Sequence, residues 1–283
     1  MIVTEKIDIR FPKTLNDALR LQANAKTRGK LLAGGTDLMV QWASGVPAPE
    51  RATSVWNLPG LCEIEIFDDG VVIGAGVTHA FIVDAKPIHR HVPALVAAAR
   101  TVGAAQIQAR GTLGGNAANA SPAGDTAPAL LITGGSVLLA SLAGIREVPL
   151  ERFWTGYREI DARPDEIILA FCLPKKGAAK ERFRKIGTRK AQAISKVMAA
   201  SRILVRKGRI ESAAIALGSV APVPVRLGEV EAFLAGKKLT PRLIGQAEKL
   251  ARETVTPIDD IRSSADYRRW VSGRLVRDAL ENV

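Results

Sequence analysis

The sequence predicts an α+β fold in two domains, and three observations support this prediction. Runs with the period-two pattern of strands are mixed with runs of helical periodicity, and the strands outnumber the helices. Residues 174–177, Pro-Lys-Lys-Gly, interrupt the pattern and predict a boundary between residues 1–175 and residues 178–283. The 283 residues are 47% apolar, which is enough to form the cores of two modest domains.

The first 56 residues predict a compact β-α-β-α unit. Residues 2–10 alternate as a short strand, and Thr14 followed by Asp17 is typical of a helix start. Residues 30–42, "KLLAGGTDLMVQW", predict a buried strand that turns into a second helix. The first helix has one apolar face, formed by Leu15, Ala18, Leu19 and Gln22.

Residues 57–175 predict a second subdomain that is rich in strands. Residues 60–80 alternate around an Asp-Asp-Gly turn, which indicates a strand, a turn and a strand. A helix is expected over residues 92–102, because Pro93 stands in its first turn and Gly103 follows its end. After a Gly-Asn loop, further strands are expected over residues 135–141, 146–150 and 166–174.

The last third of the chain predicts a sheet followed by helices. Three strands are expected between residues 181 and 227, with residues 206–209 as a hairpin tip. Two helices are expected over about 227–235 and 241–254, and a final amphipathic helix over 266–282. The residues expected on its inward face are Trp270, Leu275, Val276 and Leu280.

The charge and composition limit the classes of partner. Lys and Arg outnumber the acidic residues 40 to 28, and a net charge of +12 attracts nucleic acid, acidic proteins or anionic cofactors. No nucleic-acid module is recognised and only 5% of residues are aromatic, so we interpret this charge as solvated or partner-docking surface. No stretch approaches the roughly 18 apolar residues of a membrane span. The first 15 residues lack a secretory signal, and a cytoplasmic location is expected.

Two glycine-rich stretches indicate an anionic ligand. Residues 31–38, "LLAGGTDL", and residues 110–125, "RGTLGGNAANASPAGD", each place a glycine pair beside a threonine. Backbone N–H groups at tight turns bind phosphate oxygens, and glycine permits both close approach and positive φ. Thr36 and Thr112 add hydroxyl donors, and Asn116 adds a donor and an acceptor. Neither stretch contains a P-loop, and the G-x-G at residues 74–76 lacks the third glycine of a Rossmann site.

Other candidate groups have simpler interpretations. No carboxylate or thiol accompanies the histidines at ligand spacing, so surface or helix-capping roles are favoured over metal binding for His79, His89 and His91. Cys62 and Cys172 stand in apolar contexts and are interpreted as small buried core residues. No G-x-S-x-G elbow is present around Ser121, which argues against a hydrolase.

The same motifs carry a resemblance that covers essentially the whole chain. The quoted glycine stretches, together with "FPKTLNDAL", "IGAGVTH", "DEIILAFCLP" and "FRKIGTRKAQAISKV", resemble the FAD-binding subunits of molybdenum hydroxylases. That family includes the medium subunits of bacterial xanthine dehydrogenase and carbon monoxide dehydrogenase. The resemblance implies a two-subdomain FAD-binding domain of the vanillyl-alcohol oxidase (PCMH) type, with subdomains of about 1–56 and 57–175. It also implies a C-terminal α+β domain with a small antiparallel sheet and helices.

The resemblance further implies which residues contact FAD. The backbone of residues 31–38 and the Thr36 hydroxyl would wrap the pyrophosphate, and the second glycine pair would close over it from the other side. Ile168 would pack near the flavin, and Lys185 would lie close to its ring system. The full implied set is Leu31, Leu32, Ala33, Gly34, Gly35, Thr36, Asp37, Leu38, Thr112, Gly114, Gly115, Asn116, Asp125, Ile168 and Lys185.

The implied function is electron transfer within a multi-subunit complex. A small subunit with [2Fe–2S] clusters would deliver electrons to the flavin, and substrate would react on a large molybdopterin subunit. NAD, a quinone or oxygen would be the terminal acceptor. No catalytic acid–base pair is evident in this chain. Two alternatives stay open at this point: a free-standing flavin-dependent oxidoreductase, and a non-redox binding protein that uses the +12 charge.

Overall fold

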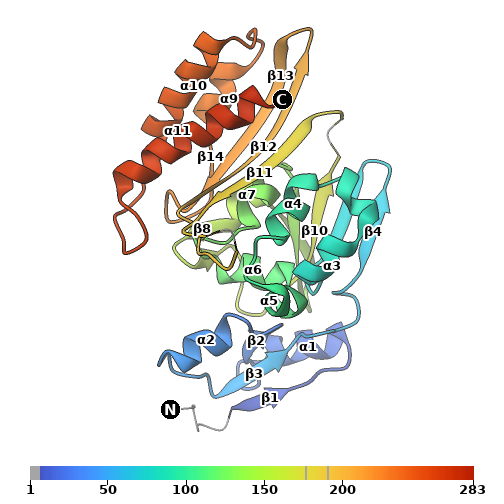
Figure 1. Cartoon of the computed structure of the whole chain (residues 1–283). Helices are drawn as coiled ribbons and strands as arrows, with labels where there is room; N and C mark the ends of the chain where they lie inside the picture. The colour runs from blue at the N-terminus through green and yellow to red at the C-terminus, as the bar shows by residue number, and fades with distance from the viewer. Residues whose placement is uncertain (1–6, 176, 190) are drawn as a thin grey trace.

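The computed structural model describes residues 7–175, 177–189 and 191–283, and it confirms the α+β fold class (Figure 1). Three parts follow one another along the chain, from the N-terminal sheet at the bottom of Figure 1 to the C-terminal helices at its top. Two predicted features fall partly outside the described residues: positions 2–6 of the first strand, and Lys176 of the boundary.

The first part is a three-stranded parallel sheet with two helices. Thr14 caps the first helix by accepting a hydrogen bond from the Asp17 amide at 3.1 Å, as predicted. The third strand was not predicted, because its pairing with both other strands is a long-range contact. The second strand is an edge strand and is therefore partly exposed rather than buried. The elements are β1 (Asp8–Arg10), α1 (Leu15–Ala23), β2 (Lys30–Leu32), α2 (Leu38–Ala43) and β3 (Arg51–Ser54).

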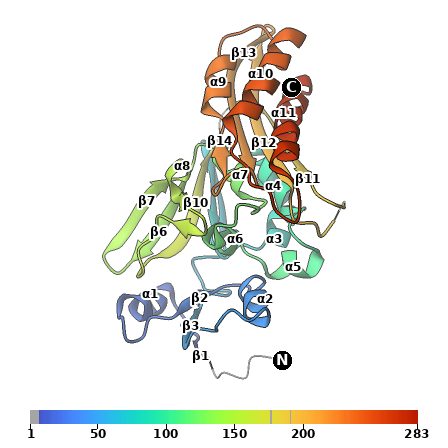
Figure 2. The same cartoon turned by 90° about the vertical axis from the view of Figure 1, so that its left-hand side faces the viewer.

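The middle part is a five-stranded antiparallel sheet in the order β4-β5-β10-β6-β7. Helices pack against one face of it, so that in Figure 2 the strands β6, β7 and β10 lie to the left of α4 and α6. The core between them contains the fully buried Phe153 and Phe171. The strands are β4 (Ile64–Phe67), β5 (Gly70–Gly74), β6 (Ser136–Ser141), β7 (Gly144–Pro149) and β10 (Ile167–Pro174), with a separate ribbon of β8 (Trp154–Gly156) and β9 (Glu159–Ile160).

The stretch predicted as a Gly-Asn loop is mostly helical, which corrects the prediction. Thr112 accepts a hydrogen bond from the Gly115 amide at 3.0 Å and thereby caps a helix that contains both glycines. Glycine disfavours a helix interior, so the packing of this helix against the sheet decides its structure. The helical segments are α3 (His79–Asp84), the 3₁₀ helix η1 (Lys86–Arg90), α4 (Pro93–Ala99), α5 (Ala105–Arg110), α6 (Leu113–Asn119), α7 (Ala127–Leu131) and α8 (Leu150–Phe153).

The last part is a four-stranded antiparallel sheet covered by three helices (Figure 1). The predicted hairpin tip is confirmed, with Lys207 and Gly208 at positive φ. Trp270 is 50% exposed rather than inward, because the buried stripe of its helix runs through Val271, Leu275 and Val276. The elements are β11 (Lys180–Ile186), β12 (Val197–Arg206), β13 (Arg209–Gly218), β14 (Val225–Arg226), α9 (Gly228–Leu234), α10 (Pro241–Thr254) and α11 (Ala265–Glu281).

Several smaller predictions are also corrected or extended. Cys62 and Cys172 are free thiols that are partly buried rather than fully buried. Cys62 precedes β4 and packs against the small core cluster that contains Leu58 and Leu61, and Cys172 lines an open cavity beside β10. His79 is 1% exposed and therefore is not a surface residue, since it opens α3 beneath the second glycine stretch. Among the described residues, no helix combines the length and apolar character needed to cross a bilayer.

Candidate functional site

The two glycine stretches lie against each other, although about 80 residues separate them in the sequence. A Cβ built on Gly34 would lie 1.7 Å from the carbonyl oxygen of Arg110. The Arg110 side chain returns to the first stretch, with its Nε 3.4 Å from the Gly34 carbonyl and its guanidinium stacked 3.9 Å from the Trp56 ring. The first and second subdomains therefore meet at these two stretches.

The first stretch presents unused hydrogen-bond donors. Within the part of the chain that the structure describes, the backbone N–H groups of residues 34–38 donate to no protein acceptor. Gly35 adopts a φ of 76°, which L-residues with side chains rarely adopt. Five consecutive free amides are donors of the kind that bind phosphate oxygens.

The second stretch uses its donors internally. The amides of Leu113 and Gly114 donate to the carbonyls of Val77 and Ala75 at 2.9 and 2.8 Å. The Gly115 amide donates to the Thr112 hydroxyl, and the Asn116 amide donates to the Thr112 carbonyl. These four amides are therefore occupied within the chain, and those of Leu113 and Gly114 hold α6 on the sheet. The implied closing of this stretch over the pyrophosphate stays a prediction.

A cleft of about 890 Å³ opens beside the two stretches. This volume lies in the upper part of the usual range for ligand pockets, which is about 300–1,000 Å³. Four members of the implied set line it: Asp37, Asn116, Asp125 and Lys185. Asp37 is one of the residues with a free amide, so the donors of the first stretch reach the edge of the cleft.

Asp125 and Lys185 form an ion pair in this cleft. Lys185 Nζ lies 2.5 Å from Asp125 Oδ2 and 3.0 Å from the Thr101 carbonyl. Burial raises the pKa of Asp125 to about 6, and the Lys185 ammonium opposes this shift. Asp125 Oδ1 is buried and has no partner among the described residues. It is therefore an available acceptor for a hydroxyl or N–H group of a ligand.

The other implied residues lie away from the cleft lining. Leu31 and Leu32 belong to β2 and pair with β3, so they support the first stretch from below. Ile168 is 9% exposed and packs into the core of the middle part.

The Asn116 side chain accepts a hydrogen bond from the Thr126 hydroxyl at 2.5 Å, which fixes its orientation in the cleft wall.

The sequence analysis missed the residues that close the cleft from the C-terminal part. Ser195 and Ser219 line the cleft, and each has a buried hydroxyl with no partner in the described chain. Arg268 also lines it, with its guanidinium held 2.7 Å from Asp260. These residues lie 70 or more positions beyond the second glycine stretch. Ser219 and Arg268 belong to no motif, and nothing in the 183–197 stretch singles out Ser195, so the sequence analysis did not identify them.

Comparisons with known proteins decide which ligand this arrangement serves. The family model "FAD binding domain in molybdopterin dehydrogenase" matches residues 5–176, and "CO dehydrogenase flavoprotein C-terminal domain" matches residues 182–283. The chain belongs to the FAD-binding medium subunits of molybdenum hydroxylases. This medium subunit is therefore an FAD-binding electron-transfer subunit, as the resemblance implied, and its relatives are subunits of multi-subunit complexes.

Relatives and solved structures agree along the whole length of this medium subunit. It is 31% identical to the putative xanthine dehydrogenase FAD-binding subunit XdhB of Escherichia coli K12, with 90% of this chain and 88% of the relative covered. It is 30% identical to the nicotine 6-hydroxylase medium subunit of Paenarthrobacter nicotinovorans, with 95% and 94% covered. The carbon monoxide dehydrogenase structure from Hydrogenophaga pseudoflava superposes with a TM-score of 0.93 at 27% identity, covering 98% of this chain and 96% of that one.

The chemistry of the cleft and of the first stretch is compatible with FAD. A dinucleotide needs donors for its diphosphate, and the free amides of residues 34–38 are donors that add no bulk. Its sugar and ring system need acceptors and cations, and Asp125 Oδ1 and Lys185 are groups of these kinds farther along the cleft. Among the described residues, no cluster of three His, Cys, Asp or Glu side chains is placed to hold a metal.

Proposed function

We propose that the backbone of residues 34–38 and the Thr36 hydroxyl bind the FAD diphosphate, and that Asn116, Asp125 and Lys185 contact the rest of the cofactor. The observation that carries this proposal is the row of five amides without a protein acceptor at the edge of a large cleft. When bound, FAD supplies the redox chemistry, which is to accept and release electrons. This chain holds the cofactor, orients it and limits its contact with water.

We also propose the route of the electrons. They arrive from the [2Fe–2S] clusters of a small subunit, after a substrate is oxidised on a large molybdopterin subunit, and leave to NAD or a quinone in the cytoplasm. The names of the relatives support this route, because they are the FAD-binding subunit of a xanthine dehydrogenase, the medium subunit of nicotine 6-hydroxylase and the medium chain of a carbon monoxide dehydrogenase. The net charge of +12 favours association with acidic surfaces of such partners.

Titration of the apoprotein with FAD tests the binding proposal. We expect one FAD per chain, with a Kd that rises when Lys185 is replaced by Met or Thr36 by Val. Failure to bind FAD, or binding unaffected by either substitution, would contradict the assignment of these residues. Reoxidation of the reduced complex with NAD⁺, a quinone and oxygen, each in turn, identifies the acceptor. Oxidation by oxygen alone would overturn the proposed acceptor classes.

A further inference from the structure

Strand β11 of the C-terminal sheet lies along helix α4 of the FAD-binding part (Figure 1). Glu181, Phe183 and Lys185 alternate along β11 and therefore share one face of the strand. Phe183 packs against the core of the middle part, and the two charged side chains flank it. The face that β11 presents to α4 is thus acidic at one end, apolar in the middle and basic at the other end.

The side chains of Glu181 and Lys185 form hydrogen bonds at opposite ends of the α4 segment. Glu181 Oε2 accepts a hydrogen bond from the Ala94 amide at 3.1 Å, in the first turn of α4. Lys185 Nζ donates to the carbonyl of Thr101, just past the last turn. Each charge has the sign that the helix dipole favours at that end. The separation of Glu181 and Lys185 along β11 is similar to the length of α4. Four strand residues span about 13 Å, and seven helical residues span about 10 Å.

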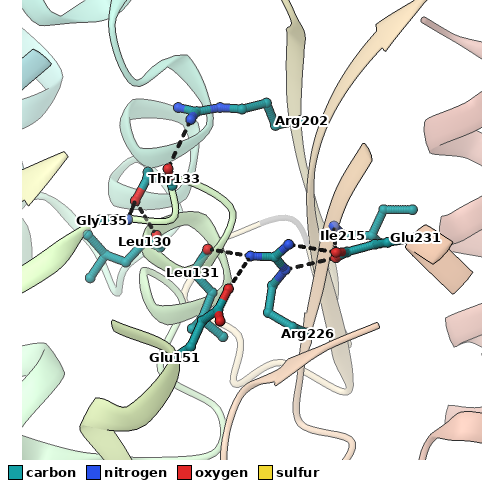
Figure 3. Close-up of polar contacts among 9 residues, drawn as sticks. All are labelled: Leu130, Leu131, Thr133, Gly135, Glu151, Arg202, Ile215, Arg226 and Glu231. Carbon is teal, nitrogen blue, oxygen red and sulfur yellow. Dashed lines mark hydrogen bonds and ion pairs between the residues drawn. The ribbon is translucent and has the colours of Figure 1, made fainter. Parts of the chain in front are cut away.

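Arg202 holds the Glu181 side chain in this position. Arg202, on the neighbouring strand β12, donates to Glu181 Oε1 at 2.6 Å. It also donates to the Thr133 carbonyl at 3.2 Å, just after α7 (Figure 3). The side chains of Glu181 and Arg202 are both only 5% exposed. Figure 3 also shows Arg226 of β14 bonded to the Leu131 carbonyl in α7, so two arginines of one sheet hold the end of the same helix.

We infer that Glu181 and Arg202 are positioning residues that fix the register of β11 on α4, so that the Lys185 ammonium reaches Asp125 in the FAD cleft. Lys185 is the only member of the implied cofactor set that the C-terminal part contributes, so its placement depends on how that part is joined to the rest. Glu181 and Arg202 do not line the cleft and act through Lys185. This inference rests on the proposed contact of Lys185 with FAD.

A double-mutant cycle on FAD affinity tests the inference. We expect K185M to raise the Kd of the apoprotein for FAD about tenfold. E181Q should raise it about fivefold in the wild-type background and less than about twofold in the K185M background, because both changes remove the same contact. The midpoint potential of the bound flavin should shift in K185M and E181Q in the same direction.

The outcomes distinguish a failure of this inference from a failure of the proposed contact between Lys185 and FAD. Equal effects of E181Q in both backgrounds would overturn the inference while leaving the Lys185 contact intact. No effect of K185M would overturn the proposed contact, and the inference would fall with it. If E181Q does not fold, E181Q/R202M replaces it, because removing both charges leaves no unpaired charge in the interior. The same non-additivity with K185M is expected for that variant.

A matched control comes from a buried glutamate elsewhere. Glu248 is 7% exposed and bonded to Arg277 and Arg252 between α10 and α11, and it does not line the cleft. E248Q should lower the thermal midpoint as E181Q does and leave the Kd for FAD unchanged. An increase in Kd for E248Q comparable to that of E181Q would show that general destabilisation explains both, and would overturn the inference.

Discussion

The two glycine pairs of this medium subunit look alike in sequence and lie side by side in the structure, yet their backbones are used in opposite ways. The amides of residues 34–38 have no protein acceptor among the described residues, whereas the amides of residues 113–116 are all bonded within the chain. A Cβ on Gly114 would lie 2.6 Å from the Ala75 Cβ, so this glycine permits close packing of α6 on the sheet. The first pair exposes donors, and the second pair brings two elements together.

The difference shows that a glycine pair near a threonine has two distinct physical uses. Among the described residues, none forms a hydrogen bond with the Thr36 side chain, whereas Thr112 is 2% exposed and caps α6. The same pair of residue types therefore leaves donors free for the proposed ligand in one place and stabilises the fold in the other. Three substitutions and one change of pH test whether each stretch contributes to FAD binding or to the stability of the fold.

The largest effect is expected from Gly34→Ala. The new methyl group would meet the Arg110 carbonyl at 1.7 Å, and a backbone atom cannot move aside cheaply. We expect the free energy of unfolding to fall by more than about 3 kcal/mol and FAD binding to be lost. Urea unfolding and FAD titration measure both. Gly228→Ala is the control, because a Cβ there meets nothing within 4 Å; equal behaviour of the two variants would contradict the close contact.

A pH effect is expected for the second stretch, through His79. Burial lowers the pKa of His79 to about 4, and its amide donates to the Gly111 carbonyl at the start of the stretch. Between pH 6.5 and pH 4 the unfolded state binds the proton more readily, so stability falls as the pH falls through this window. We expect this histidine to account for a loss of about 2 kcal/mol between pH 7 and pH 5.

Comparison of wild type with His79→Gln isolates that contribution. Urea unfolding at pH 7 and pH 5 should show a smaller loss in the variant, because glutamine does not titrate. Parallel losses in the two proteins would mean that His79 is not held neutral in the folded state. Flavin affinity at pH 7 should change little, since His79 does not line the cleft.

Thr36→Val should weaken FAD binding without changing the apoprotein. The Thr36 hydroxyl donates to no group of the described residues, so its loss removes only the proposed ligand contact. We expect the Kd for FAD to rise about tenfold and the free energy of unfolding of the apoprotein to stay the same. FAD titration and urea unfolding of the same preparation check this. A lower free energy of unfolding without a change in the Kd for FAD would contradict the proposed contact of Thr36 with FAD and would indicate a role in the fold instead.

The smallest effect is expected from Thr112→Val, the matched change in the second stretch. It removes the hydroxyl that accepts from the Gly115 amide, and the loss of such a cap costs about 1 kcal/mol of unfolding free energy. The effect on FAD affinity should be smaller than that of Thr36→Val. Thermal unfolding and FAD titration of both variants together test the contrast; a larger loss of affinity in Thr112→Val would contradict it.

Local signals in the sequence were enough for much of the fold. The Thr14 and Asp17 pair predicted the start of α1, and the Asp-Asp-Gly turn predicted the hairpin of β4 and β5. The hairpin tip at residues 207–208 was predicted in the same way. These features depend on residues within a few positions of one another, so the sequence contains them directly.

Four of the implied cofactor residues line the cleft. Asp37, Asn116 and Asp125 lie in the two glycine stretches that the sequence indicated as a ligand site, whereas Lys185 came only from the family resemblance. Ser195, Ser219 and Arg268 reach the same cleft from the C-terminal part, and no spacing along the chain predicts that. Their proximity follows from how the sheet of β11–β14 packs on α4 and α7, which is a long-range property.

The sequence by itself determined the segments that bend, begin helices and pair as hairpins, because glycine, threonine caps and turn residues act locally. Only the tertiary structure decided which of two similar glycine pairs keeps its donors free. The physical reason is that an amide is available to a ligand only when no other part of the chain brings it an acceptor. Ala75 and Val77 bring acceptors to residues 113 and 114, and no described segment brings one to residues 34–38.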